Sequence, residues 1–129
     1  MLASEGWHVL AAVRDPQSAP PGTQAEVVDM GDPASIAALA HRLRARNQRL
    51  DALVHTAGVY QRPARETWAV NLLGPLLLTR ALEPLLAPGA RVVMVTSGLG
   101  ELSAQPASLV KRLSDPKLSL ADFERMATE

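Results

Sequence analysis

The stretch Arg91-Val92-Val93-Met94-Val95-Thr96-Ser97 gives the clearest indication of how this chain folds. The apolar run that begins after Arg91 is typical of a buried strand. A hydroxyl side chain follows it at Ser97. Open α/β sheets bind their ligands at the carboxyl ends of the strands, which is where this hydroxyl is expected. The stretch therefore predicts a sheet strand with a candidate site residue at its end.

Further strands and helices alternate upstream of this stretch. Asp32-Pro33 is a favourable helix start, because Asp is a good N-cap and Pro suits the first helical position. Strands that alternate with helices imply βα units and a parallel sheet. We therefore predict a single α/β domain over 1–129, a Rossmann-like doubly wound parallel sheet, with strands at 7–13, 25–28, 50–55 and 91–96, a helix from Asp32-Pro33 and a longer one from about 65 to 82.

Shorter features are expected around these elements. Residues 1–5 are typical of a last helical turn, with Gly6 as its terminator. The prolines between Asp15 and Thr23 predict a loop, and Pro84, Pro88 and Gly89 are expected to end the long helix. Ser119 and Asp122 have the spacing of a capping box that opens a final short helix.

The composition narrows the classes of partner. The chain of 129 residues carries 13 basic and 13 acidic residues, so a nucleic acid or an anionic membrane is not expected as its main partner. Its longest apolar stretch, 72–78, is interrupted by Gly74 and Pro75 and is too short to cross a membrane. Absence of cysteine excludes disulfides and thiolate metal sites and is compatible with the cytoplasm. No metal site is expected from the three scattered histidines His8, His41 and His55.

Several short segments follow one another in a characteristic order. They are Gly6-Trp7-His8-Val9, Val13-Arg14-Asp15, Val28-Asp29, Ala57-Gly58, Asn71 and Thr96-Ser97. Taken together, these segments resemble the short-chain dehydrogenase/reductase family, and the resemblance extends from Met1 to about Gly100. It implies an oxidoreductase that moves hydride between NADP(H), or less favourably NAD(H), and a small-molecule carbonyl or alcohol.

This sequence departs from the family pattern at three points. The Gly-rich loop that cradles the cofactor pyrophosphate in the family is not in this sequence. The family's Asn-Asn-Ala-Gly turn is His55-Thr56-Ala57-Gly58 here. The Tyr-x-x-x-Lys motif is absent, because Tyr60 has Ala64 four residues later. We therefore expect a segment of a longer enzyme, truncated at both ends and inactive alone.

Two residues carry the catalytic roles that the resemblance implies. Ser97 would hydrogen-bond the substrate carbonyl oxygen, although a hydroxyl at a strand end can also satisfy local backbone. Asn71 would complete a proton relay through its backbone carbonyl. Pro75 has no N–H to give that carbonyl, so a helix kink is expected there, with or without a catalytic role.

The resemblance also places cofactor contacts at three strand ends. Arg14 in place of an acidic residue favours NADP, since Arg pairs with a 2′-phosphate, but it can equally be a solvated charge. Asp29 would contact the adenine, or else bond its own turn. Ala57-Gly58 would let the backbone approach the cofactor, and Thr56 would partly replace the family Asn. His55 is expected to be structural.

The doubly wound strand order, 3-2-1-4-5-6, has a consequence for this chain. The visible strands would be the second to the fifth, so the first strand is missing from between 7–13 and 50–55. Two strand edges are then left without a partner, unless they close up and pair directly.

Two other function classes fit the same residues. One is a non-catalytic remnant that binds a nucleotide or a partner. The other is a different Rossmann-type enzyme such as a methyltransferase, against which the Asn71–Pro75 kink and the Thr96-Ser97-Gly98 strand end argue.

Overall fold

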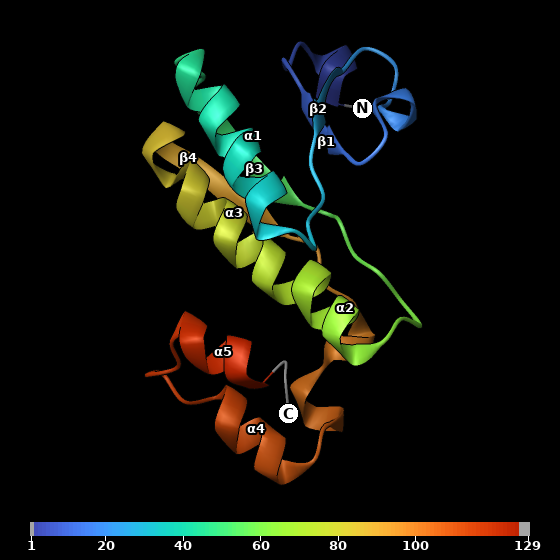
Figure 1. The fold of residues 1–129 in the computed structure, drawn as a ribbon, viewed down its shortest axis with the longest axis vertical. Coiled ribbons are helices and arrows are strands. Elements are labelled where there is room, and N and C mark those ends of the chain that lie inside the picture. The colour runs from blue at the N-terminus through green and yellow to red at the C-terminus, as the bar shows by residue number, and fades with distance from the viewer. Residues whose placement is uncertain (1, 127–129) are drawn as a thin grey trace.

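The computed structural model describes residues 2–126, whose path is shown in Figure 1. Strands and helices alternate as the sequence predicts, and the domain is of the α/β class. The strands are β1 (Leu10–Val13), β2 (Gln24–Val27), β3 (Leu50–His55) and β4 (Leu86–Met94), and the helices are α1 (Pro33–Ala45), α2 (Ala64–Trp68), α3 (Gly74–Leu82), α4 (Ala107–Leu113) and α5 (Leu120–Met126).

The four strands form two separate parallel pairs. β1 pairs with β2, with Leu10 opposite Gln24, and β3 pairs with β4, with His55 opposite Met94. Within the described residues β1 and β3 do not pair with each other. The two strands that were expected to flank a missing strand have therefore not closed up.

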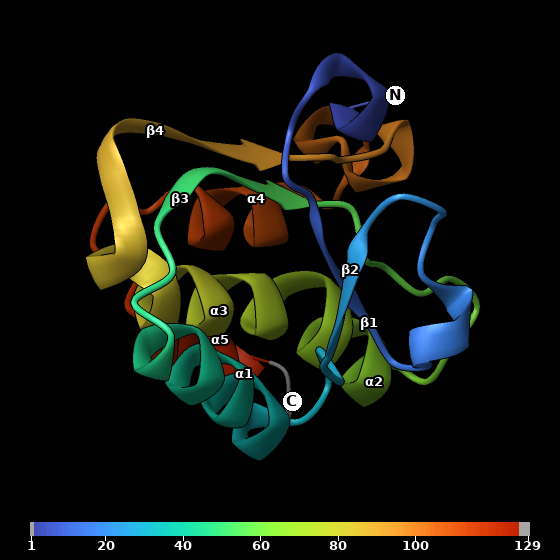
Figure 2. The same cartoon turned by 90° about the horizontal axis from the view of Figure 1, so that it is seen from above.

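Helices α1 and α3 run side by side and cover one side of the β3–β4 pair (Figures 1 and 2). The Asp32 carboxylate caps α1, accepting a hydrogen bond from the Ala34 N–H at 2.9 Å, and Pro33 opens the helix. This confirms the predicted helix start. The apolar stripe of α1 packs with α3 and the end of β2 into one aliphatic core of Val28, Met30, Ile36, Leu39, Ala40, Leu43, Leu78 and Leu82.

The long helix predicted from about 65 to 82 is continuous but not uniform. A π-helical turn, Ala69–Leu73, joins α2 to α3. In that turn the Gly74 N–H donates to the Ala69 carbonyl, five residues earlier instead of four. α3 then passes so close to the chain after β2 that a Cβ on Gly74 would lie 2.4 Å from the Met30 carbonyl oxygen. Only glycine allows this approach.

The start of β4 differs from the prediction. The strand begins at Leu86 rather than Arg91, so Pro88 and Gly89 lie inside it instead of ending the helix. They occupy a bulge, because Leu50 pairs with Leu86 whereas Ala52 pairs with Arg91. Bulges tolerate the proline and the positive φ of Gly89, 79°.

Smaller boundary differences occur near the N-terminus. The predicted helical turn at 1–5 is a 3-10 helix, Leu2–Glu5, followed by Gly6 with φ 88°; Met1 lies outside the described residues. The strand predicted at 7–13 is limited to Leu10–Val13. The predicted loop contains a 3-10 turn, Pro16–Ser18, that Asp15 caps.

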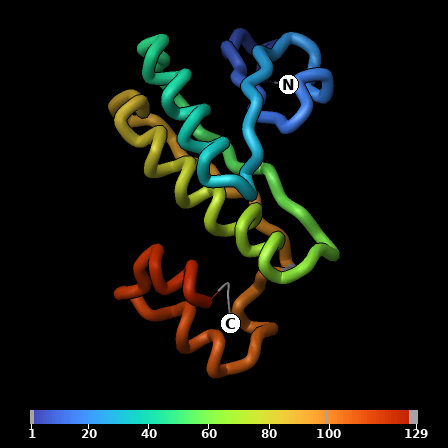
Figure 3. The backbone as a smooth tube through the Cα atoms, viewed as in Figure 1, coloured from blue at the N-terminus to red at the C-terminus, as the bar shows by residue number. Residues whose placement is uncertain are grey.

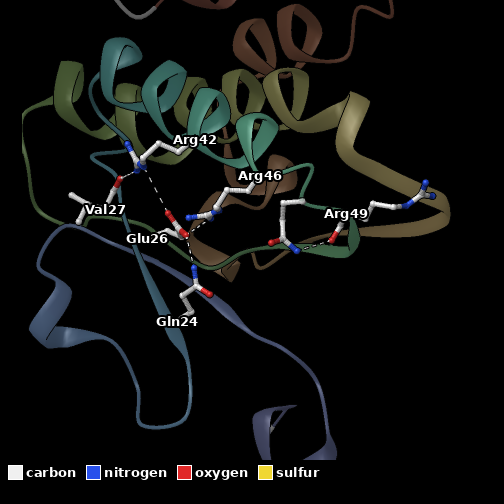
Figure 4. Close-up of polar contacts among 7 residues, drawn as sticks. Gln24, Glu26, Val27, Arg42, Arg46 and Arg49 are labelled. Carbon is white, nitrogen blue, oxygen red and sulfur yellow. Dashed lines mark hydrogen bonds and ion pairs between the residues drawn. The ribbon is translucent and has the colours of Figure 1, made fainter.

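A buried carboxylate links β2 to α1, as Figure 4 shows. The side chain of Glu26 is 6% exposed, and it bonds Arg46 and lies 3.8 Å from Arg42 Nε. Gln24 donates to the same carboxylate at 3.0 Å. Arg42 also donates to the Val27 carbonyl at 2.6 Å. The two arginines therefore bind β2 through both the Glu26 side chain and the Val27 backbone.

The C-terminal helices α4 and α5 lie at the opposite end of the molecule from β1 and β2 (Figure 3). The predicted capping box is confirmed: Asp122 accepts from the Ser119 N–H at 2.8 Å, and the Asp122 N–H donates to Ser119 Oγ at 3.3 Å. Hydrogen bonds from Ser119 lower the pKa of Asp122. No helix within residues 2–126 is both long and apolar enough to cross a lipid bilayer.

Candidate cofactor and active site

A small cavity lies at the carboxyl ends of β1, β2 and β3. It has a volume of about 180 Å³. Four of the seven predicted site residues, Arg14, Asp29, Ala57 and Gly58, are among its lining residues, which also include Ala12, Val28, Met30, Val59 and Val70. Residues from three separate strand ends therefore meet where α/β sheets bind ligands.

Arg14 and Asp29 supply the charges of this cavity. Arg14 directly follows β1 and is exposed. Asp29 follows β2, and its Oδ1 accepts from the Gly31 N–H at 2.8 Å. The Asp29 N–H in turn donates to Ser35 Oγ at 2.9 Å. Asp29 therefore bonds its own turn, which is one of the two roles predicted for it. It also lines the cavity in which the other role, contact with the adenine, would take place.

The Ala57-Gly58 segment is held in place by Asn71. Asn71 Oδ1 accepts from the Val59 N–H at 2.8 Å, and Asn71 Nδ2 donates to the Val59 carbonyl at 2.9 Å. This two-way bond fixes the loop after β3 to the long helix. The sequence argument concerned only the Asn71 backbone carbonyl and missed this contact.

The Asn71 carbonyl lies in the π-helical turn. Four residues later stands Pro75, which has no N–H to donate to that carbonyl. The departure from regular helix therefore falls where a kink was expected. Such π-helical turns occur frequently at functional sites.

Ser97 and Thr56 lie at the same edge of the sheet but outside the small cavity. The Val95 N–H extends the pairing of β4 by donating to the His55 carbonyl at 2.9 Å. Ser97, two residues further on and exposed, therefore follows β4 at the end where Thr56 follows β3. Thr56 lines a second, larger cavity.

The larger cavity, of about 580 Å³, lies between β1 and β3. It shares Ala12, Met30 and Ala57 with the small cavity, so the two adjoin. Its walls are residues 7–12 and 48–57, and its core-facing side includes Leu39, Leu43, Leu78 and Leu82.

His55 is buried and has a structural contact. Its Nε2 lies 2.8 Å from Thr79 Oγ1, and the Thr79 hydroxyl donates to the Pro75 carbonyl at 2.7 Å. The Thr79 oxygen is therefore the acceptor, and the Nε2 of His55 carries the proton. Burial lowers the pKa of His55, which favours this neutral form.

Val59 and Gly74 position the site but were not among the predicted residues. Val59 lines the small cavity, donates its N–H to Asn71 Oδ1 and accepts from Asn71 Nδ2 through its carbonyl. Gly74 lets α3 approach Met30. Gly74-Pro75 was available as a signal, because a glycine beside a helix-breaking proline marks a close backbone approach.

Comparison with known proteins identifies the family. The model of a family described as enoyl-(acyl carrier protein) reductase matches residues 2–112. The chain belongs to the short-chain dehydrogenase/reductase family. Among curated relatives, 1-hydroxy-2-glutathionyl-2-methyl-3-butene dehydrogenase of Rhodococcus sp. (strain AD45) is 40% identical over an alignment of 85 residues that covers 58% of this chain.

Solved structures of short-chain dehydrogenases share the fold. Menthone neomenthol reductase from Mentha piperita has a TM-score of 0.80 and 23% identity, covering 98% of this chain and 65% of its own. A metagenomic short-chain oxidoreductase in complex with NADP has a TM-score of 0.63 and 27% identity, covering 82% of this chain and 57% of its own. This short-chain dehydrogenase/reductase chain spans 37% of the length of the Rhodococcus relative.

Proposed function

We propose that this chain forms the cofactor-binding part of a cytoplasmic, NADP(H)-dependent oxidoreductase that acts on a small-molecule carbonyl or alcohol. The observation that supports this most directly is the cavity shared by Arg14, Asp29 and Ala57-Gly58. One family member with a related fold is in complex with NADP.

The residues of the cavity fit the adenosine end of such a cofactor. A volume of about 180 Å³ is below the roughly 300–1,000 Å³ of pockets that bury a drug-sized ligand, so it suits one end of a dinucleotide. The Arg14 guanidinium would bind a 2′-phosphate, and the Asp29 carboxylate would accept a hydrogen bond from the adenine. Ala57 and Gly58 present no bulky side chain to the ligand.

Ser97 and Asn71, which do not line this cavity, would act on the substrate and on the proton relay. When bound, the cofactor supplies or accepts a hydride. The Ser97 hydroxyl would donate a hydrogen bond to the substrate oxygen, on which negative charge develops during reduction. Asn71 would hold the loop through its side chain and a relay water through its carbonyl.

Nucleotide binding to the purified chain tests the cofactor proposal. Isothermal titration should show tighter binding of 2′,5′-ADP than of 5′-AMP. Arg14→Ala should weaken 2′,5′-ADP binding by about tenfold or more, as expected for lost charge-assisted hydrogen bonds, and leave 5′-AMP binding within about twofold. Arg80→Ala, which changes an exposed arginine of α3, is the matched control. Equal affinity of the wild-type chain for both nucleotides would contradict the proposal.

Turnover is a separate measurement. Because the sequence has no Tyr-x-x-x-Lys, we expect the chain to bind NADPH without oxidising it in the presence of aldehydes and ketones. The expected result is saturable quenching of tryptophan fluorescence by NADPH, with no turnover. A non-catalytic nucleotide-binding protein would give the same result. Turnover that Ser97→Ala abolishes would show that the chain is active alone.

A further inference from the structure

Two adjacent residues after β1, Arg14 and Asp15, favour opposite cofactors. At a strand end of a dinucleotide-binding sheet, an acidic side chain accepts a hydrogen bond from the ribose 2′-OH of NAD, whereas an arginine accommodates the 2′-phosphate of NADP. Both residues lie within two positions of Val13, the last residue of β1. The preference of the site therefore depends on which of the two side chains faces the ligand.

The backbone directs these two side chains differently. Asp15 has an extended backbone, with φ −111° and ψ 118°. Successive side chains of an extended chain point to opposite sides. Among the described residues that line the small cavity, Arg14 is present and Asp15 is not. The arginine is therefore the residue that this strand end presents to the ligand.

The Asp15 carboxylate is engaged by its own loop. Its Oδ1 accepts from the Gln17 N–H at 2.9 Å, as in an Asx turn, and so caps the 3-10 turn Pro16–Ser18. The Asp15 carbonyl accepts from the N–H and from the hydroxyl of Ser18, at 2.9 and 2.6 Å. These three hydrogen bonds fix the direction in which the chain leaves Arg14.

A carboxylate released from this cap would act on a bound cofactor in two ways. It would supply the acceptor that a ribose 2′-OH needs, and so favour a cofactor without the 2′-phosphate. It would also repel a 2′-phosphate, because two like charges that lie close together at a protein surface raise each other's energy. Both effects oppose the effect of Arg14.

We propose that Asp15 is a positioning residue that determines the preference of this chain for a 2′-phosphorylated cofactor. As a cap, its carboxylate holds the loop so that the Arg14 guanidinium stays at the cavity, and the same hydrogen bond keeps the carboxylate away from the ribose. The inference rests on the proposed NADP(H) binding, to which it adds a residue that the ligand does not contact.

Three substitutions of Asp15 separate its cap from its charge. Asp15→Asn keeps an acceptor oxygen in the same place, and so keeps the cap, but removes the charge. Asp15→Ala removes both. Asp15→Glu keeps the charge but, with one more methylene, no longer fits the Asx turn. Isothermal titration of each purified chain with 2′,5′-ADP and with 5′-AMP gives the ratio of the two affinities, which a change in global stability alone would not alter.

The three variants should differ in this ratio. Asp15→Asn should stay within about twofold of the unsubstituted chain, because the cap remains. Asp15→Ala should weaken 2′,5′-ADP binding about fivefold, as expected for a lost cap, and leave 5′-AMP binding within about twofold. Asp15→Glu should lower the ratio at least about tenfold, since its carboxylate repels the phosphate. A ratio that Asp15→Asn lowers as much as Asp15→Glu, or that either of the other two leaves unchanged, would overturn the proposal.

Ser18→Ala is the matched control within the same turn. It removes the hydroxyl that donates to the Asp15 carbonyl and leaves the carboxylate cap in place. The affinity ratio should therefore stay within about twofold of that of the unsubstituted chain, because Ser18 still donates its N–H. A loss equal to that of Asp15→Ala would mean that any loosening of the loop has this effect, and would overturn the specific role of the carboxylate.

A double substitution tests whether Asp15 acts through Arg14. In chains that also carry Arg14→Ala, Asp15→Ala and Asp15→Asn should bind 2′,5′-ADP within about twofold of each other, because the group that the cap positions is gone. A difference as large as in the presence of Arg14 would overturn the proposal. No preference for 2′,5′-ADP in the unsubstituted chain would contradict NADP(H) binding itself, whereas a preference that the Asp15 variants retain would contradict only this inference.

Discussion

The two strand pairs are joined to the helical layer by different chemistry. β1–β2 is attached through Glu26, whose carboxylate contacts Arg42 of α1 and Arg46 directly after it, with side chains that are 41% and 43% exposed. β3–β4 is attached through His55, which is buried against Thr79 of α3 and neutral. The first attachment is ionic and reached by water, and the second is uncharged and enclosed. The two pairs should therefore loosen in response to different changes.

The largest expected loss of unfolding free energy comes from a substitution that disturbs both strand pairs, β1–β2 and β3–β4, at once. Gly74→Ala would place a Cβ 2.4 Å from the Met30 carbonyl oxygen, so α3 or the chain after β2 must shift. Overpacking of this kind costs about 1–3 kcal/mol of unfolding free energy. Urea unfolding measures the loss, and amide exchange should accelerate in both β2 and β3.

Gly98→Ala is the matched control for this prediction. A Cβ on Gly98 meets no atom within 4 Å, so the unfolding free energy should change by no more than about 0.5 kcal/mol. An equal effect of the two substitutions would mean that glycine content, rather than the approach of α3 to Met30, sets the stability.

A smaller loss of unfolding free energy is expected from a substitution that affects only the β1–β2 pair. Glu26→Ala removes the acceptor of Gln24 and Arg46 and should cost about 1–2 kcal/mol, less than a fully buried ion pair because the arginines remain partly hydrated. Amide exchange should accelerate in β1 and β2 and stay unchanged in β3. Glu26→Gln, which keeps an acceptor oxygen, should cost less, and faster exchange in β3 would contradict independent attachment.

The smallest effect concerns pH and the β3–β4 pair. Burial lowers the pKa of His55 below the ordinary histidine value of 6.5. As the pH falls below about 6.5, the unfolded chain binds a proton that the folded chain does not, so the unfolding free energy decreases until the pH reaches the folded pKa. Unfolding measured between neutral and mildly acidic pH should show this decrease.

Two histidine variants make the pH prediction specific. His55→Gln should remove the part of the decrease that arises from this group, and His41→Gln, at an exposed position of α1, should retain it. A decrease of unchanged slope in His55→Gln would show that other groups cause it.

Local sequence signals predicted local structure well. Asp32-Pro33 opens α1, Leu50–His55 forms β3 with the predicted bounds, and Ser119 with Asp122 makes its capping box. Each depends on residues a few positions apart. The start of β4 was wrong because Pro88 and Gly89 break a helix and can also be absorbed by a bulge, and only pairing with β3 distinguishes the two outcomes.

Long-range contacts account for what the sequence did not predict. The shared cavity of Arg14, Asp29 and Ala57-Gly58 follows from strand ends meeting at one edge, which the strand pattern implies. By contrast, nothing local shows that Asn71 bonds Val59, 12 residues away. Nor does anything local show that Glu26 pairs with Arg46, 20 residues away.

The π-helical turn at Ala69–Leu73 has a consequence for the direction in which the start of the helix faces. One extra residue is wound into this turn, so everything before it is rotated by about 100° relative to an uninterrupted α-helix. Deleting a single residue there would restore regular winding but would turn α2 away from its present neighbours. The side that α2 presents is thus set by the extra residue in the turn Ala69–Leu73 rather than by its own five residues.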